Sequence, residues 1–136
     1  MGIEFVDHTA DVAVRVSASD LAEIVKLAVV AEGLALVGEW DGGTRLAKRG
    51  DRFGIEVSAD GPDFTSALVS LLNDLLFLVE EKGAIPVDFE VDEIRITSER
   101  AEISGTVILD DGWSPTEELK AVSYGLRWEI LLIFDV

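Results

Sequence analysis

The sequence contains no cysteine and a single histidine, His8. Disulfides, thiolate metal ligands and thiol nucleophiles are therefore excluded, and a structural zinc site, which usually takes several Cys or His ligands, is not expected. No apolar run approaches the roughly 18 residues that a membrane span requires. Residues 1–5 lack the basic-then-apolar profile of a signal peptide, so we expect a cytoplasmic protein.

Basic residues are also scarce in this chain. It has 11 Lys and Arg against 27 Asp and Glu, a net charge of −16, and only Arg95 and Arg100 oppose the ten acids between Pro86 and Glu118. Such a surface repels phosphate backbones, so direct binding to nucleic acid is disfavoured. It is either a solvated surface that keeps the protein soluble or one that meets a basic partner. The basic cluster in a Gly-rich connection is expected to be an exposed loop: Arg45, Lys48, Arg49 and Arg52.

Recognisable catalytic motifs are missing as well. The sequence has no Gly-rich phosphate loop, no GxSxG nucleophile turn and no His/Glu zinc motif. Its 136 residues and 49% hydrophobic content predict a single domain over residues 1–136 with its own core. We therefore expect a binding protein that is not itself an enzyme.

Apolar periodicity predicts strands and helices in the first part of the chain. Alternation over residues 12–16 indicates a strand, and Asp20 with Glu23 resembles a capping box that opens a helix to about Val37. Gly33 inside that helix costs roughly 1 kcal/mol relative to Ala. A loop over residues 38–51 leads to a strand over 53–57.

A second helix is predicted to open over Asp60-Gly61-Pro62-Asp63, with Pro62 in its first turn, and to end at about Gly83. Its leucine-rich face should be buried. The last third then reads as strands over 87–91, 94–96, 103–109, 119–124 and 128–134. Strands that follow one another in sequence favour antiparallel pairing. The predicted class is therefore α+β, a two-layer α/β sandwich in which two helices cover one face of a mostly antiparallel or mixed sheet.

Two segments offer candidate ligands for a metal ion. Asp7, His8 and Asp11 fall within five residues that lead into the first predicted strand. They are either turn residues that bind backbone N–H groups or a site where carboxylate oxygens coordinate a hard cation such as calcium. At the other end, Asp135 and the α-carboxylate of Val136 lie next to each other, and a cation shared with a third carboxylate would relieve their repulsion.

Four motifs together resemble the archease family: Asp-His-Thr-Ala-Asp at 7–11, Leu-Leu-Asn-Asp-Leu-Leu-Phe at 71–77, Leu-Lys-Ala-Val-Ser-Tyr at 119–124 and the terminal Ile-Phe-Asp-Val at 133–136. Their order and spacing match along nearly the whole chain. The resemblance implies a small α/β sandwich that assists RtcB-type RNA ligases, which use GTP and a divalent metal to join RNA ends in tRNA splicing and RNA repair. The archease promotes guanylylation of a ligase histidine and multiple turnover.

The resemblance also implies which residues act. The cation site of the family matches Asp11, Asp135 and Val136 here, with calcium the first expectation and manganese or magnesium the alternatives. Lys120 is implied in partner activation, and Asp7 and His8 are further candidates for that role. Two features depart from the family pattern, since Gly125 follows Tyr124 where the family usually has histidine, and the stretch before the last strand is short.

Two other functions remain open from the residues alone. One is a small metal-dependent hydrolase that uses Asp7, His8 and Asp11. The other is a general chaperone that binds client proteins. Turnover of a phosphoester by the protein alone would favour the hydrolase.

Overall fold

The computed structural model describes residues 2–6, 11–39, 45–116, 121–125 and 130–135. Strands and helices alternate in the first half of the chain, and strands alone form the rest, as the sequence predicted. The elements are β1 (Gly2–Val6), β2 (Asp11–Ser17), α1 (Leu21–Leu36), β3 (Arg52–Gly61), α2 (Phe64–Lys82), β4 (Ile85–Ile96), β5 (Ala101–Asp110), β6 (Ala121–Gly125) and β7 (Ile130–Asp135).

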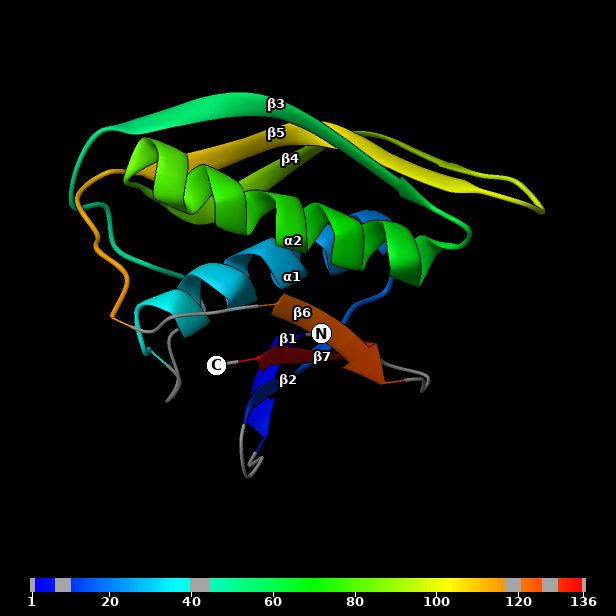
Figure 1. Cartoon of the computed structure of the whole chain (residues 1–136), viewed down its shortest axis with the longest axis horizontal. Coiled ribbons are helices and arrows are strands. Elements are labelled where there is room, and N and C mark those ends of the chain that lie inside the picture. The colour runs from blue at the N-terminus through cyan, green and yellow to red at the C-terminus, as the bar shows by residue number, and fades with distance from the viewer. Residues whose placement is uncertain (1, 7–10, 40–44, 117–120, 126–129, 136) are drawn as a thin grey trace.

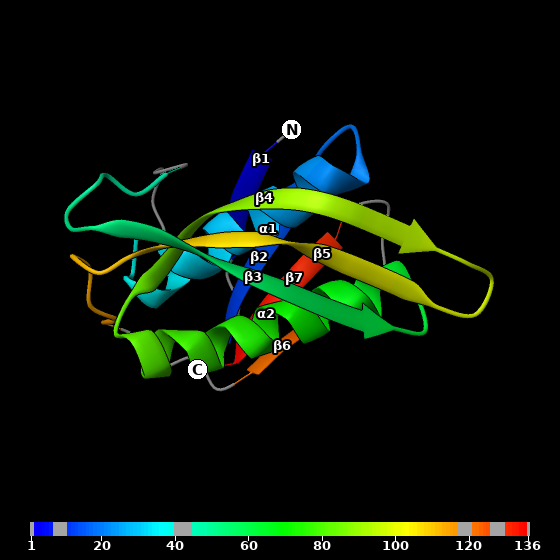
Figure 2. The same ribbon diagram turned by 90° about the horizontal axis from the view of Figure 1, so that it is seen from above.

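Within the described residues the strands form two sheets, one of four strands in the order β1-β2-β7-β6 and one of three in the order β3-β5-β4. All neighbouring strands are antiparallel. Figure 1 shows both helices between the two sheets, and Figure 2 shows β3, β5 and β4 crossing above them. The α+β class and the antiparallel pairing are confirmed. The layers differ from the prediction, because the helices have a sheet on each side.

The burial of α1 explains this arrangement. Nearly every residue from Ile24 to Leu36 is buried, whereas a helix on the outside of a single sheet would bury only one stripe. α1 contacts β4 in one sheet and β2 and β7 in the other. Its start matches the prediction, since the Asp20 carboxylate accepts a hydrogen bond from the Glu23 N–H at 2.8 Å.

Gly33 lies where α1 crosses β4. A Cβ atom at this position would lie 2.0 Å from the backbone carbonyl oxygen of Pro86. Glycine lowers the stability of the helix at this position, but only a residue without a side chain allows the helix to approach the sheet this closely.

The C-terminal end and buried face of α2 match the prediction, whereas the helix begins after Pro62, with Asp63 as its N-cap. The Asp63 carboxylate accepts a hydrogen bond from the Ser66 N–H at 2.8 Å, and Gly83 ends the helix with φ 62°. Left-handed backbone of this kind favours glycine. The completely buried residues of α2 are Ala67, Leu68, Leu71, Leu72 and Leu75.

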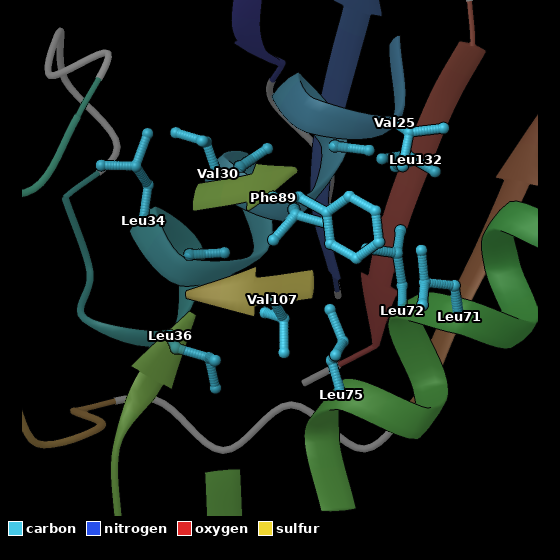
Figure 3. Close-up of a cluster of buried hydrophobic side chains, with 14 of the residues drawn as sticks. Val25, Val30, Leu34, Leu36, Leu71, Leu72, Leu75, Phe89, Val107 and Leu132 are labelled. Carbon is cyan, nitrogen blue, oxygen red and sulfur yellow. The ribbon is translucent and has the colours of Figure 1, made fainter. Parts of the chain in front are cut away.

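The hydrophobic core connects the helices with both sheets. In Figure 3, Phe89 of β4 and Val107 of β5 lie among residues of both helices, and Leu132 of β7 enters from the other sheet. The other labelled core residues are Val25, Val30, Leu34 and Leu36 of α1 and Leu71, Leu72 and Leu75 of α2. The core therefore positions β2 and β7, whose ends hold two of the predicted site residues.

Candidate functional site

The pairing of β2 with β7 brings Asp11 and Asp135 together in the backbone. Asp11, the first residue of β2, is the direct antiparallel partner of Asp135, the last residue of β7. Directly opposite residues of an antiparallel pair have Cα atoms about 4.5–5.5 Å apart. Two residues 124 positions apart in sequence (135 − 11) are thus cross-strand neighbours.

Buried residues further along both strands fix this register. Val14 is paired with Leu132, and the side chains of both, with those of Val16 and Phe134, are completely buried. A slip of one residue would turn these apolar side chains toward the opposite face of the sheet. The same packing that stabilises the sheet therefore fixes the pairing of Asp11 with Asp135.

The third strand at this end is β6. Its first residue, Ala121, is the partner of Asp135 on the other side of β7. Lys120 and Val136 are the sequence neighbours of Ala121 and Asp135. Asp7, His8, Lys120 and Val136 lie outside the described residues, as do the side chains of Asp11 and Asp135.

Like charges directly opposite in a sheet destabilise the pair, so two aspartates in register call for a compensating positive charge. Carboxylate oxygens are hard ligands of the kind that calcium, magnesium and manganese prefer. Elsewhere, among the side chains that the structure describes, no group of three or more Asp, Glu or His could hold a metal ion.

A buried carboxylate that sequence reasoning missed, that of Asp110, lies at the end of β5. This side chain is completely buried and accepts hydrogen bonds from the backbone N–H groups of Arg49 (3.2 Å), Gly50 (2.9 Å) and Gly112 (2.8 Å). The Arg52 Nε–H donates to it at 3.0 Å. Asp110 therefore joins the basic loop to the turn after β5.

The basic loop is exposed, as predicted, but it is not free of contacts. The guanidinium of Arg49 lies 3.6 Å from the ring centroid of Trp113, a cation–π geometry. The indole N–H of Trp113 donates to the Ala47 carbonyl at 2.8 Å, and Arg52 donates to the Leu46 carbonyl at 3.0 Å. Two of the four basic side chains therefore stabilise the loop.

Glu32 is a buried acid that sequence reasoning also missed. It lies in α1 with none of its surface exposed, and among the described residues neither of its carboxylate oxygens has a hydrogen-bond partner. Burial raises the pKa of Glu32 well above its usual value. The unpaired environment favours the neutral acid over the carboxylate.

The outer face of the β3-β5-β4 sheet has a hollow of ≈ 260 Å³ among Ser58, Asp60, Glu93, Arg95, Arg100 and Glu102. Its arginines are paired with acids, Arg95 with Glu93 at 2.8 Å and Arg100 with Glu102 at 2.9 Å and with Asp60. These pairs leave no arginine of the hollow available for an anion without breaking an ion pair.

Of the helices described, none is long and apolar enough to cross a membrane.

The structure is thus an antiparallel α+β fold in which two aspartates are paired in the backbone at the ends of neighbouring strands. Comparison with known proteins adds the family. The model of the archease protein family matches residues 3–136. Proteins named archease from Pyrococcus abyssi and Pyrococcus furiosus are each 30% identical over 125 and 124 residues, which cover 89% of this chain and 82% of theirs. The chain belongs to the archease family.

Two solved structures share the fold. The solution structure of Methanobacterium thermoautotrophicum protein 1598 has a TM-score of 0.68 at 23% identity and covers 99% of both chains. A crystal structure from Thermotoga maritima, described as an archease and possible chaperone, has a TM-score of 0.52 at 17% identity and covers 96% of this chain and 94% of that one.

Proposed function

We propose that this protein binds a divalent cation and, as a non-catalytic partner, promotes guanylylation and multiple turnover of an RtcB-type RNA ligase in tRNA splicing and RNA repair. The cation ligands are Asp11, Asp135 and Val136, with calcium the preferred ion. Lys120 contributes to activation of the partner, with Asp7 and His8 as further candidates.

The register of Asp11 with Asp135 is the observation that supports the cation site most strongly. Like charges on directly opposite residues are destabilising, and a bound cation would remove this repulsion. Oxygen donors alone, without a cysteine in the chain, fit calcium, magnesium or manganese better than zinc. The bound ion supplies positive charge that holds the ends of β2 and β7 together.

The position of Lys120 supports its role in activation. Lys120 immediately precedes Ala121, and Ala121 is paired with Asp135 in the backbone. In sequence the lysine therefore precedes a strand that is paired with the strand ending at the proposed cation ligands. An interface formed there would present a lysine and a cation to the ligase.

The division of labour follows from the chemistry of the two proteins. The ligase provides the histidine nucleophile, GTP and the RNA-binding surface, and GMP is transferred to the histidine as pyrophosphate leaves. This chain, with a net charge of −16, has an unfavourable surface for RNA but a suitable one for an enzyme that binds RNA through basic residues.

The test is single-turnover transfer of labelled GMP to the ligase of the same organism, with and without this protein. We expect acceleration by the wild type and loss of it in Asp11→Ala. Asp92→Ala is the matched control, because Asp92 is an exposed acid on β4 and its loss removes the same charge. Lys120→Ala should lower the rate while calcium binding is retained.

Two results would count against the proposal. Absence of acceleration by the wild type would refute the activator function. Acceleration that survives Asp11→Ala would retain the partner but refute the cation mechanism. Each assay includes the protein without ligase, so that any phosphoester hydrolysis by this chain alone would identify it as a hydrolase instead.

A general chaperone function is the second candidate, because the structurally similar Thermotoga maritima protein is described as a possible chaperone. A chaperone would protect unrelated client proteins from aggregation. An activator would act only on its ligase. Light scattering of a heat-denatured client, with and without this protein, separates the two.

A further inference from the structure

The outward face of α2 exposes a phenylalanine that the core does not use. Leu71, Leu72 and Leu75 are completely buried, whereas Phe77 leaves 71% of its surface exposed. Burial of such a side chain is worth about 1.5–3 kcal/mol, which the isolated protein does not gain. Because single exposed hydrophobic residues are common, the surroundings of Phe77 decide whether it has a role.

Those surroundings are acidic. Residues three and four positions apart lie on one face of a helix, so Asp74, Glu80 and Glu81 flank Phe77. All three acids are exposed, and the nearby cation, Lys82, already lies 3.4 Å from Glu81. A ring face surrounded by carboxylates suits an arginine or lysine, which can stack on the ring and form ion pairs around it.

The C-terminal half of α2 and the end of β7 lie on the same side of the molecule (Figures 1 and 2). α2 contacts β6, and β6 is paired with β7 so that Ala121 lies opposite Asp135. A partner that covers this half of α2 would therefore also reach the strand ends that hold Asp11 and Asp135.

We infer that Phe77, with Asp74, Glu80 and Glu81 around it, is the docking surface for the ligase, and that it receives an apolar patch of that enzyme that contains arginine or lysine. This inference rests on the proposed function. Charge argues against other occupants. A second copy would bring the same three acids against each other, and nucleic acids and anionic membranes repel them.

Affinity for the ligase of the same organism, measured by titration calorimetry, tests the docking surface. We expect Phe77→Ala to weaken the Kd at least about tenfold, as a buried aromatic at the centre of an interface does. Ile96→Ala is the matched control, since Ile96 is 52% exposed at the end of β4, and its Kd should stay within about twofold of the wild type. Both side chains are exposed, so neither substitution should change the melting temperature.

The charged part of the surface has its own readout. Glu81→Gln and Asp74→Asn should each reduce the dependence of Kd on salt concentration, because each removes an ion pair with the ligase. At a concentration that saturates the ligase, the Phe77→Ala variant should support the same rate of GMP transfer as the wild type, because the substitution affects docking and not the cation site.

The outcomes separate the docking surface from the proposed function. If the wild type binds and accelerates the ligase while Phe77→Ala binds equally well, the docking surface is wrong and the function stands. A wild type that neither binds nor accelerates the ligase overturns both. A wild-type dimer in sedimentation that Phe77→Ala dissociates would assign this face to a second copy and overturn the inference.

Discussion

Asp110→Asn is expected to destabilise the protein by about 3–4.5 kcal/mol, because two hydrogen bonds to one carboxylate oxygen are lost. Oδ1 of Asp110 accepts from the N–H groups of Gly50 and Gly112, and the amide oxygen of Asn can keep both. Oδ2 accepts from the Arg49 N–H and the Arg52 Nε–H, and the amide nitrogen would face these donors with further donors.

The magnitude follows from the nature of these two bonds. Hydrogen bonds to a charged group contribute about 1.5–3 kcal/mol each. The Arg52 side chain is 30% exposed and can be partly hydrated after the substitution, which places its loss at the low end. Asp111→Asn is the matched control, since exposed Asp111 accepts a single bond, from the Asp51 N–H at 2.8 Å. The amide oxygen of Asn can keep this bond, so the expected loss is below about 0.5 kcal/mol.

The effect of Asp110→Asn should also depend on pH. Burial alone would raise the pKa of Asp110, but hydrogen bonds from Gly112, Arg49, Arg52 and Gly50 together hold it below its usual value. A lowered folded-state pKa stabilises the protein above the unfolded-state value of about 3.9, and this contribution is lost as the pH falls below it. The difference between wild type and variant should therefore be full at pH 7 and narrow below about pH 4.

Urea unfolding gives the free energy of unfolding for each protein from the midpoint and slope. A loss below about 1 kcal/mol for Asp110→Asn, or a larger loss for Asp111→Asn, would refute the reasoning about this hydrogen-bonded cluster.

Two further predictions concern the core. Leu72→Ala should lower the free energy of unfolding by about 2–5 kcal/mol, because it opens a cavity in a completely buried position. Asp74 is exposed, so Asp74→Ala should lower it little. Denaturant melts that rank the two variants in reverse would mean that the buried face of α2 is misassigned. Relative to the wild type, Glu32→Gln should stabilise the protein increasingly as the pH rises from 5 to 8. The pKa of Glu32 is raised in the folded state, so its contribution to the stability of the wild type is complete below the unfolded-state pKa of about 4.3 and is lost as the pH rises toward the folded-state pKa. Thermal melts of both proteins across this pH range measure the difference, and parallel curves would contradict a buried, unpaired Glu32.

Local sequence patterns predicted the elements well where local chemistry determines them. Asp20 begins α1 and Gly83 ends α2 as expected, since each acts within a few residues of backbone. The leucine-rich face of α2 followed from helical spacing in the same way. β4 is one strand but was predicted as two segments. Irregularities in register between Pro86 and Asp88 and between Val91 and Glu93 interrupt the alternation on which the prediction relied.

The layers and the buried acids depend on distant contacts and could not be read locally. Apolar residues on every side of α1 do signal a central helix, but the prediction used only one of its faces. Nothing local in the sequence marks Glu32 and Asp110 as buried acids, because their burial depends on residues far away in sequence. β1 was not predicted; it pairs with β2 in register from Gly2–Ser17 to Val6–Ala13.

The candidate site shows the same division. The resemblance named Asp11 and Asp135, but only the long-range register of β2 and β7 places them opposite each other. Loop-closure over more than a hundred residues leaves no local trace in sequence. The strand pairing makes the two aspartates cross-strand neighbours, and their role as cation ligands remains a proposal.

Calorimetric titration of calcium into the metal-free protein tests the central claim most directly. We predict one calcium ion per chain for the wild type and for Asp92→Asn, and loss of binding in both Asp11→Asn and Asp135→Asn. The bound ion should also raise the melting temperature of the wild type, because it binds only the folded state. A wild type that takes up no calcium, manganese or magnesium, or binding that survives both substitutions, would contradict the account.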